Sequence, residues 1–361
     1  MLESKKNLLG YSMIPLIDFF KSINEPKYRA QQLLKWIHQK GVTNFDLMTD
    51  FNKPLREKLK SLATLEVPKV SKVFKSPEGT EKYLVELASG SMIEMVVIPE
   101  KKRTTLCISS QVGCALQCTF CATGAQGFEK NLTADEIIGQ LWLANFYTKN
   151  SNNISNVVFM GMGEPLLNFD PVIESAKLMK DQFAYGLSRK RITLSTSGIT
   201  PKINKFFKEI DVSLAISLHA PYDKLRDEIV PINKKYPIKK LIEACKNYLK
   251  YYEGKRNVTI EYILIEGVND SKDNAIKLAK LLKDISCKIN LIPFNPFDGN
   301  DYKRSNNKTI KIFKQVLMDS GYITTLRVTR GDVIDGACGQ LVGKLNKPVK
   351  GKNIIDHQFV S

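Results

Sequence analysis

The sequence predicts an α/β fold organised around a parallel sheet, open or closed into a barrel. After Arg103, short apolar segments alternate with longer amphipathic ones, which is the pattern of repeated strand–helix units. The chain has 361 residues, of which 43% are hydrophobic, enough for a substantial core. At about 150 residues per domain, this length favours two domains.

The first hundred residues have a different pattern from the rest. Residues 1–65 are expected to form a small helical domain, because three segments carry apolar residues near helical spacing. These segments are Met13–Ile23, Tyr28–Gln39 and Pro54–Leu62. Residues 66–103 are expected to form a short β connection, since the runs KVSKVFK, KYLVELA and SMIEMVVI are separated by turn residues.

Residues 104–343 are expected to form the α/β core, followed by a short basic tail at 344–361. The predicted strands are Thr105–Ser109, Asn156–Met160, Arg191–Ser195, Val212–Leu218, Val258–Leu264, Lys288–Ile292 and Ile323–Val328. The predicted helices between them are Ala134–Tyr147, Pro171–Gln182, Ile238–Tyr251, Lys272–Ile285 and Lys308–Asp319. Because ligands of such folds bind at the carboxyl ends of the strands, residues that follow the strands are candidate site residues.

The composition favours a basic protein of a reducing compartment. Lys and Arg number 54 against 37 Asp and Glu, a net charge of +17, which favours a polyanionic partner such as nucleic acid. A lysine-rich compositional bias is the alternative explanation. The sequence has no run of about 18 apolar residues that would predict a membrane span, and its start lacks the apolar core of a signal peptide. Seven cysteines without the density of a disulfide scaffold indicate the cytoplasm.

Three closely spaced cysteines are the most informative feature of the core. Cys114, Cys118 and Cys121 have the spacing C-x3-C-x2-C, which lets three thiolates converge on one inorganic centre. A four-iron cluster held by three cysteines keeps one iron without a protein ligand, whereas ferredoxin sites use four cysteines. A structural zinc site would need a fourth ligand and usually a second cysteine pair, and three unrelated buried cysteines are the remaining alternative. The spacing, with Phe120 before the third cysteine, resembles the signature of the radical S-adenosylmethionine (SAM) superfamily.

Several predicted strands end in residues that resemble the SAM contacts of that superfamily. In the run Gly161-Met162-Gly163-Glu164, the glycines let the backbone approach a ligand, and the carboxylate can accept hydrogen bonds from an ammonium group. A tight turn is the alternative for this run, and a structural role is the alternative for the other strand ends. The candidate SAM contacts are Gly163, Glu164, Ser195, Ser217, Leu218, His219 and Asn295.

Two further cysteines are candidates for covalent chemistry. Cys338 is flanked by Ala337 and Gly339, small residues that keep its thiol accessible. Cys107 precedes the loop of the cysteine triad, so it is expected at the same mouth of the fold. Two extra thiols near the cleft of a cluster-bearing enzyme suggest covalent cysteine catalysis, and a buried, unreactive thiol is the alternative for Cys338.

Six segments together resemble the adenine-C2 RNA methyltransferases of the radical SAM superfamily. They are LCISSQVGCALQCTFCATG, GMGEPLLN, RITLSTSG, SLHAPYD, FNPF and VIDGACGQL, and the resemblance covers essentially the whole chain. It implies a partial, TIM-like (β/α) radical SAM barrel, with a small helical N-terminal accessory domain that binds RNA and a short β linker. It also implies a [4Fe–4S] cluster on Cys114, Cys118 and Cys121, with SAM as the second cofactor.

The resemblance further implies a ping-pong route with two SAM molecules per turnover. One SAM methylates Cys338 to S-methylcysteine, and a second yields a 5′-deoxyadenosyl radical that takes a hydrogen from the S-methyl group. The carbon radical adds to adenine C2, and Cys107 then resolves the protein–RNA adduct, forming a transient disulfide with Cys338. Glu94 matches the position of the family's proton acceptor; from the residues alone it is one polar residue in an apolar strand.

The implied substrates are 23S rRNA, at an adenine of the peptidyl-transferase centre, and tRNA, at the adenine 3′ to the anticodon. The expected electron donor is a protein such as flavodoxin or a ferredoxin, and the expected state is a monomer. A related family methylates C8 of an rRNA adenine. It shares the three cysteines of the triad and the later cysteine, Cys338. Pro165 and Phe297 favour the C2 family, and a zinc-bearing RNA-binding protein is the distant alternative.

Overall fold

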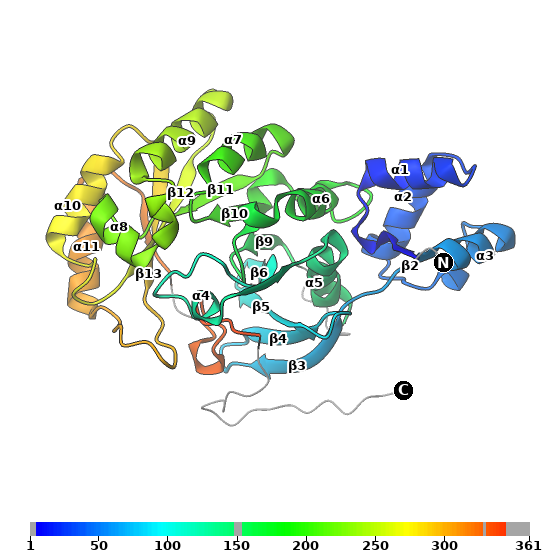
Figure 1. Ribbon diagram of the computed structural model, residues 1–361, viewed down its shortest axis with the longest axis horizontal. Helices are drawn as coiled ribbons and strands as arrows, with labels where there is room; N and C mark the ends of the chain where they lie inside the picture. Colours follow the sequence, from blue (N-terminus) through cyan, green and yellow to red (C-terminus); the bar gives the residue numbers. More distant parts are fainter. Residues whose placement is uncertain (1–4, 148–153, 328–329, 344–361) are drawn as a thin grey trace.

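The computed structural model describes residues 5–147, 154–327 and 330–343. Its centre is a ten-stranded sheet in the order β14-β13-β12-β11-β10-β9-β6-β5-β4-β3. Figure 1 shows this sheet as a curved layer with helices along its outer side. Within this sheet, β6 and β9 to β14 run parallel, whereas β3 to β6 alternate in direction. The basic tail 344–361 lies outside the described residues.

The parallel half of the sheet is an incomplete barrel. Within this half, each strand pairs with the one that comes after it, β6 with β9, β9 with β10 and so on to β14. The sheet therefore curves in one direction, and β14 remains at an edge. Its strands are β6 (Arg103–Cys107), β9 (Asn156–Phe159), β10 (Ile192–Thr196), β11 (Ser213–Ser217), β12 (Val258–Leu264), β13 (Cys287–Pro293) and β14 (Thr324–Leu326). The predicted partial (β/α) barrel is confirmed, and each predicted core strand is present within about two residues of its expected bounds; Val328, the predicted end of the last strand, lies outside the described residues.

Helices connect the parallel strands and cover the sheet. They are α4 (Ala122–Gln126), α5 (Ala134–Phe146), α6 (Phe169–Lys180), α7 (Thr200–Glu209), α8 (Asp223–Ile229), α9 (Ile238–Tyr251), α10 (Lys272–Leu281) and α11 (Asn307–Asp319). Local sequence explains where several begin: α5 starts at a capping box of Thr133 and Glu136, and Ser271 caps α10. The sequence prediction missed α7, α8 and the short α4; α4 and α8 have 5 and 7 residues, too few turns for a strong periodic signal.

The segment expected as a short β connection extends the barrel sheet. Its strands are β3 (Lys69–Lys75), β4 (Glu81–Glu86) and β5 (Met92–Glu100), close to the predicted runs. A tight turn at Lys101–Lys102 pairs β5 antiparallel with β6, with Glu100 opposite Arg103. The segment is therefore part of the same sheet as the core, and it forms the wall beside the first barrel strand.

The N-terminal residues form a helical module, as the sequence predicted. Its helices are α1 (Met13–Ser22), α2 (Tyr28–Leu34) and α3 (Lys53–Leu62). The predicted helix 28–39 divides into α2 and a π-helical turn at Lys35–Gln39. The short strands β1 (Lys6–Asn7) and β2 (Ala63–Thr64) pair in parallel and bring the two ends of the module together.

The helical module packs on the outer helices of the barrel. Trp142 of α5 donates a hydrogen bond from Nε1 to the carbonyl oxygen of Ile37 at 3.0 Å, and Nδ1 of His38 lies 3.1 Å from the hydroxyl of Tyr185. A Cβ at Gly10 would lie 2.3 Å from the main-chain nitrogen of Asp135, so the backbones touch there. One buried apolar cluster runs from the module into the barrel. In the described part of the chain, no helix is both long and apolar enough to span a membrane.

Candidate active site

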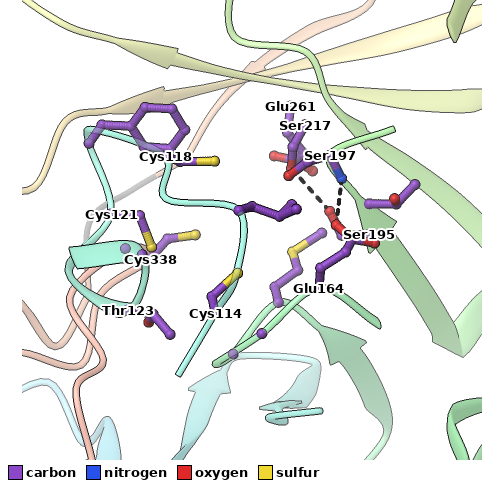
Figure 2. A pocket seen from close by; sticks show the side chains of 18 of the residues that line it. Cys114, Cys118, Cys121, Thr123, Glu164, Ser195, Ser197, Ser217, Glu261 and Cys338 are labelled. Atoms are coloured by element: carbon purple, nitrogen blue, oxygen red, sulfur yellow. Dashed lines mark hydrogen bonds between the residues drawn. The ribbon is translucent and has the colours of Figure 1, made fainter. Parts of the chain in front are cut away.

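A cavity opens at the carboxyl ends of the parallel strands. Its empty volume is about 940 Å³, including the solvent at its mouth. Its walls come from the segments that follow β9, β10 and β11, from β12 and β13, and from the loops that carry the cysteine triad and Cys338. Figure 2 shows side chains from these segments around one space. The site therefore lies where parallel α/β folds gather their ligands.

A buried arginine holds two of these strand ends in place. Arg226 of α8 is fully buried, and its guanidinium donates hydrogen bonds to the carbonyl oxygens of Ser197, Ser217 and Leu218 at 2.6, 3.1 and 2.9 Å. Another N–H donates to Oδ1 of Asn233 at 2.8 Å. Burial lowers the pKa of Arg226 to about 10, so the side chain remains charged at neutral pH.

The cysteine triad lies on a loop between two short paired strands. β7 (Gln111–Gly113) pairs antiparallel with β8 (Phe128–Asn131), and α4 lies within the excursion between them. Gly113 has φ +71°, and a Cβ there would lie 1.8 Å from the carbonyl oxygen of Gly127, so only glycine fits. At the other end of the loop, the N–H of Cys121 donates to the carbonyl of Cys118 at 3.1 Å.

The three thiols of the triad are free and line the same cavity. Burial raises the pKa of Cys114 to about 12 and raises that of Cys118 well above its ordinary value, with Cys121 and Cys114 adding to the rise. The thiols are therefore close enough to interact, and Figure 2 shows their sulfur atoms at one end of the cavity beside Cys338. Because cysteine binds metals as thiolate, iron would replace these protons, and the three residues fit an iron–sulfur cluster.

The spacing of the thiols does not suit a single metal ion. Among residues 5–147, 154–327 and 330–343, no group of three or more His, Cys, Asp or Glu side chains lies close enough to hold one ion. A lone zinc needs its ligand atoms converged at about 2.0–2.3 Å from one centre. A four-iron cluster instead binds each thiolate at a separate corner, so a wider arrangement accommodates it.

The Gly-Glu segment after β9 forms the opposite wall of the cavity. Gly163 has φ +94°, and a Cβ there would lie 2.5 Å from Cβ of Gln111. Glu164 lines the cavity although only 2% of it is exposed. Its Oε2 accepts a hydrogen bond from the N–H of Ser197 at 2.8 Å, and its Oε1 accepts from the N–H of Leu166 at 3.1 Å. Burial raises the pKa of Glu164, and a cationic ligand group would compensate the buried charge.

Hydroxyl groups and a histidine complete this side of the cavity. Ser195 and Ser217 lie on the adjacent strands β10 and β11 with their hydroxyl oxygens 3.4 Å apart. Nδ1 of His219 accepts a hydrogen bond from the N–H of Ile263 at 3.1 Å, and its ring packs edge-on against Phe120. Burial lowers the pKa of His219 to about 3, so the ring is neutral. Because Nδ1 is an acceptor, Nε2 carries the proton and can donate to a ligand.

Two predicted SAM contacts lie behind the cavity wall. The side chain of Leu218 is buried in the core, and its N–H donates to the carbonyl of Glu261 at 3.1 Å. Asn295 donates from Nδ2 to the carbonyl of Cys338 at 3.1 Å and accepts from Arg304 at 3.0 Å. Of the predicted contacts, the structure brings together at the cavity Gly163, Glu164, Ser195, Ser217 and His219. A SAM-binding role for Leu218 and Asn295 stays a prediction.

The two predicted catalytic cysteines are neighbours at the edge of the cavity. Cys338 lines the cavity from the loop of residues 331–343, which we call the Cys338 loop. Cys107 ends β6 and is buried; burial raises its pKa to about 12, and nearby Cys338 adds to the rise. Both are free thiols in the described structure. The predicted disulfide between them therefore stays a prediction.

Two charged residues at this edge were missed by the sequence prediction. Glu261 of β12 is buried and lines the cavity, with Oε2 accepting from Nδ2 of Asn290 at 2.7 Å; burial raises its pKa. Arg327 follows β14, and although burial opposes its charge, Cys338 and Glu261 raise its pKa. The sequence did contain a sign of Glu261. It is the charged residue in the apolar run VTIEYIL, just as Glu94 is the charged residue in the apolar run SMIEMVVI.

Glu94, the predicted proton acceptor, lies behind the Cys338 loop. It does not belong to the residues that line the cavity. Its Oε1 lies 3.1 Å from Nζ of Lys82, and its Oε2 accepts a hydrogen bond from the N–H of Val342 at 2.9 Å. The loop therefore separates the carboxylate of Glu94 from the cavity.

Comparison with protein families and curated relatives accounts for most of the chain. Residues 6–65 match the ribosomal RNA large subunit methyltransferase N-terminal domain, and residues 108–279 match the radical SAM superfamily. The dual-specificity RNA methyltransferase RlmN of Marinomonas sp. (strain MWYL1) is 54% identical over 95% of both chains. The RlmN of Pseudomonas entomophila (strain L48) is 54% identical over 95% of this chain and 92% of its own length.

A solved structure has the same architecture. The crystal structure of a radical SAM methyltransferase from Sphaerobacter thermophilus matches with a TM-score of 0.88 and 38% identity, covering 94% of this chain and all of that one. The superfamily implies a [4Fe–4S] cluster and SAM, which agrees with the chemistry of the triad and of the Glu164 wall. The chain belongs to the dual-specificity RNA methyltransferases of the radical SAM superfamily.

Proposed function

We propose that the protein methylates C2 of adenine in 23S rRNA, at the peptidyl-transferase centre, and in tRNA, at the position 3′ to the anticodon. The observation that carries this proposal is one cavity that holds the cysteine triad, the Glu164 wall and the thiol of Cys338. The name of the relatives, dual-specificity RNA methyltransferase, supports two kinds of RNA substrate. The membership in the radical SAM superfamily leaves no support for the zinc-protein alternative.

The substrate carbon explains why radical chemistry is needed. C2 of adenine is an electron-poor aromatic carbon, so it does not attack the methyl group of SAM directly. When bound to Cys114, Cys118 and Cys121, a [4Fe–4S] cluster supplies the electron that cleaves SAM. Glu164 would bind the ammonium group of SAM, and the Nε2–H of His219, which also lines the cavity, would be available as a donor.

Cys338 carries the methyl group in a ping-pong reaction with two SAM molecules per turnover. Its thiolate first takes the methyl of one SAM and releases S-adenosylhomocysteine. Reductive cleavage of the second SAM gives methionine and a 5′-deoxyadenosyl radical, which removes one hydrogen atom from the S-methyl group. The resulting carbon radical adds to C2. The adduct then loses one electron, which the cluster held by Cys114, Cys118 and Cys121 would take back after its oxidation in SAM cleavage, and the C2 proton, leaving a thioether between Cys338 and the base.

Glu94 and Cys107 complete the reaction. Glu94 accepts the proton that leaves C2, and the electron pair of that C–H bond restores the aromatic ring. The Cys107 thiolate then attacks the sulfur of Cys338, the sulfur–carbon bond breaks, and the carbon takes up a proton to become the methyl group. The two cysteines are left as a disulfide, which an external reductant returns to thiols with two electrons. The nearness of the two thiols supports this exchange.

The remaining parts of the proposal concern partners and location. The helical module of residues 6–65 binds RNA, and a flavodoxin or ferredoxin-type protein donates the electron to a monomeric enzyme. The cytoplasm is the compartment in which the free cysteines of the described chain and the reducible disulfide are maintained. Methylation at C8 is the second candidate; Pro165, which lines the cavity, and Phe297 favour C2.

Product analysis tests the proposed function directly. The full-length enzyme, reconstituted anaerobically with iron and sulfide, is incubated with SAM, a reductant and either unmodified rRNA or tRNA. We expect 2-methyladenosine in digests of both RNAs, measured by mass spectrometry against authentic standards. 8-Methyladenosine as the product would instead identify the enzyme with the related C8 family.

Substitution of a triad cysteine tests the cluster assignment. Cys118→Ala is expected to reduce the bound iron to background and abolish methylation, because two thiolates do not hold a cluster that needs three. The measurement is iron per chain together with the visible absorbance after anaerobic reconstitution. Cys245→Ala is the matched control, since Cys245 is a buried free thiol in α9. Normal iron content in Cys118→Ala would remove the triad from the cluster site.

The two other cysteines are expected to fail at different steps. Cys338→Ala should retain iron and SAM binding but leave RNA unmethylated, because no methyl group can be loaded. Cys107→Ala should load Cys338, bond to the RNA and stop, since nothing attacks the Cys338 sulfur. A denaturing gel should therefore show a covalent protein–RNA complex in Cys107→Ala, and none in the Cys107→Ala/Cys338→Ala double variant. Normal turnover by Cys107→Ala would contradict this division of roles.

The helical module offers a separate test of RNA binding. Arg29, Arg56, Lys58 and Lys60 are engaged by partners within the module, whereas Lys27, Lys35 and Lys40 are exposed on its surface. Replacing these three lysines by Gln should weaken RNA binding and flatten its salt dependence, by about 0.7 in log–log slope for each phosphate that the protein no longer neutralises.

The control for this test replaces three exposed lysines outside the module, Lys250 of α9, Lys272 of α10 and Lys283 just after α10. The net charge change is the same in both variants, so a difference between them reports where the RNA phosphates bind. Binding of RNA is measured by filter retention at several salt concentrations. Equal affinities and slopes in the two triple variants would mean that the module does not bind RNA phosphates through these lysines.

A further inference from the structure

A buried ion pair links the antiparallel strands to the Cys338 loop. Lys82 of β4 and Glu94 of β5 are diagonal neighbours on one face of the sheet, since Lys82 lies opposite Val96 and Glu94 opposite Leu84. Nζ of Lys82 lies 3.1 Å from Oε1 of Glu94, and the two side chains are only 7% and 2% exposed. Lysine is seldom buried this deeply without a specific partner, and a buried pair is by itself a weak source of stability.

The pair contacts the Cys338 loop on both sides of the cysteine. Before the cysteine, Nζ of Lys82 donates a hydrogen bond to the carbonyl oxygen of Asp335 at 3.4 Å. After it, the N–H of Val342 donates to Oε2 of Glu94 at 2.9 Å. The loop therefore rests on the ion pair at two points, with Cys338 between them. Figure 1 shows this orange-red segment beside α4 and the antiparallel strands.

The two carboxylate oxygens of Glu94 have different partners, so one can hold the side chain in place while the other contacts the loop. Oε1 is held by Lys82, whose position is set by the strand and by packing of Nζ against the ring of Phe74, 5.0 Å from its centroid. Oε2 is held by a main-chain N–H of the loop. Displacement of the Val342 N–H from Oε2 would free that oxygen to accept a proton, while Lys82 would keep the carboxylate in place and compensate its charge.

We propose that Lys82 is a positioning residue for methylation, which holds the carboxylate of Glu94 at the Cys338 loop so that Glu94 can take the C2 proton. This inference rests on the proposed function, in which Glu94 is that proton acceptor. Lys82 itself forms no bond to the substrate. Without it, the carboxylate would be buried with no compensating cation, an arrangement that proteins avoid, and it would lose its defined orientation.

The test uses full-length Lys82→Met, which keeps the length of the side chain and removes the charge. Iron content and methylation of Cys338, followed by peptide mass spectrometry, should match the wild type. Turnover of RNA should fall by about tenfold to 100-fold, part of what a general base contributes. A covalent protein–RNA complex should accumulate although Cys107 is present, because loading and bond formation precede the proton step. Lys82→Arg, which restores a cation, should recover turnover and remove the complex.

Lys75→Met is the matched control, because Lys75 lies in the adjacent strand and pairs with Glu81, but half of its side chain is exposed. It should turn over normally. If Lys82→Met yields too little folded protein, Lys82→Gln provides the same comparison with a polar side chain. Normal turnover by the uncharged variants, or failure to methylate Cys338 at all, would overturn the inference, since the second result indicates a structural role only.

Glu94→Gln separates a failure of this inference from a failure of the proposed function. If Glu94→Gln accumulates the covalent complex and Lys82→Met does not, Lys82 has no positioning role and the proposed function stands. If neither variant accumulates the complex, the assignment of Glu94 as proton acceptor fails, and the inference fails with it. Accumulation in both, with recovery in Lys82→Arg, supports both.

Discussion

The hydrogen bonds of Arg226 are the constraint on which the site depends. The loops after β10 and β11 turn their carbonyl groups away from solvent, and one guanidinium satisfies those of Ser197, Ser217 and Leu218. Each buried carbonyl left without a partner would cost about 1–3 kcal/mol. The same positive charge opposes the rise in the pKa of the Cys118 thiol. Arg226 therefore shapes the ligand wall and favours thiolate at the cluster loop beside it.

Burial of the side chains in the cavity controls their protonation. Burial keeps His219 neutral and raises the pKa of the Cys114 and Cys118 thiols, so a bound ligand would decide the charge of these two thiols. A cationic ligand group would compensate the buried charge of Glu164, and a bound metal would replace the thiol protons. The cavity therefore favours positively charged ligands although the chain as a whole is strongly basic.

The antiparallel strands connect the barrel to the Cys338 loop. β5 pairs with the first barrel strand, with Val96 opposite Cys107, and it also presents Glu94 to Val342 of the Cys338 loop. A segment that the sequence predicts as a short connection thus carries Glu94, its partner Lys82 and the hydrogen bond to the Cys338 loop. On the opposite side, Asn295 holds the carbonyl of Cys338, so the thiol lies between the two halves of the sheet.

The sequence alone determined the features that depend on local spacing. The triad and the Gly-Glu segment are each encoded within about ten consecutive residues, and each strand or helix of the alternation is read from its own segment, so the barrel and the family resemblance could be predicted. Only the tertiary structure decided which residues meet. It set Leu218 and Asn295 behind the wall, brought Glu261 and Arg327 to Cys338, and paired Lys82 with Glu94. Those pairings depend on strand register and on loops that return from distant positions, and neither leaves a periodic signal in the chain.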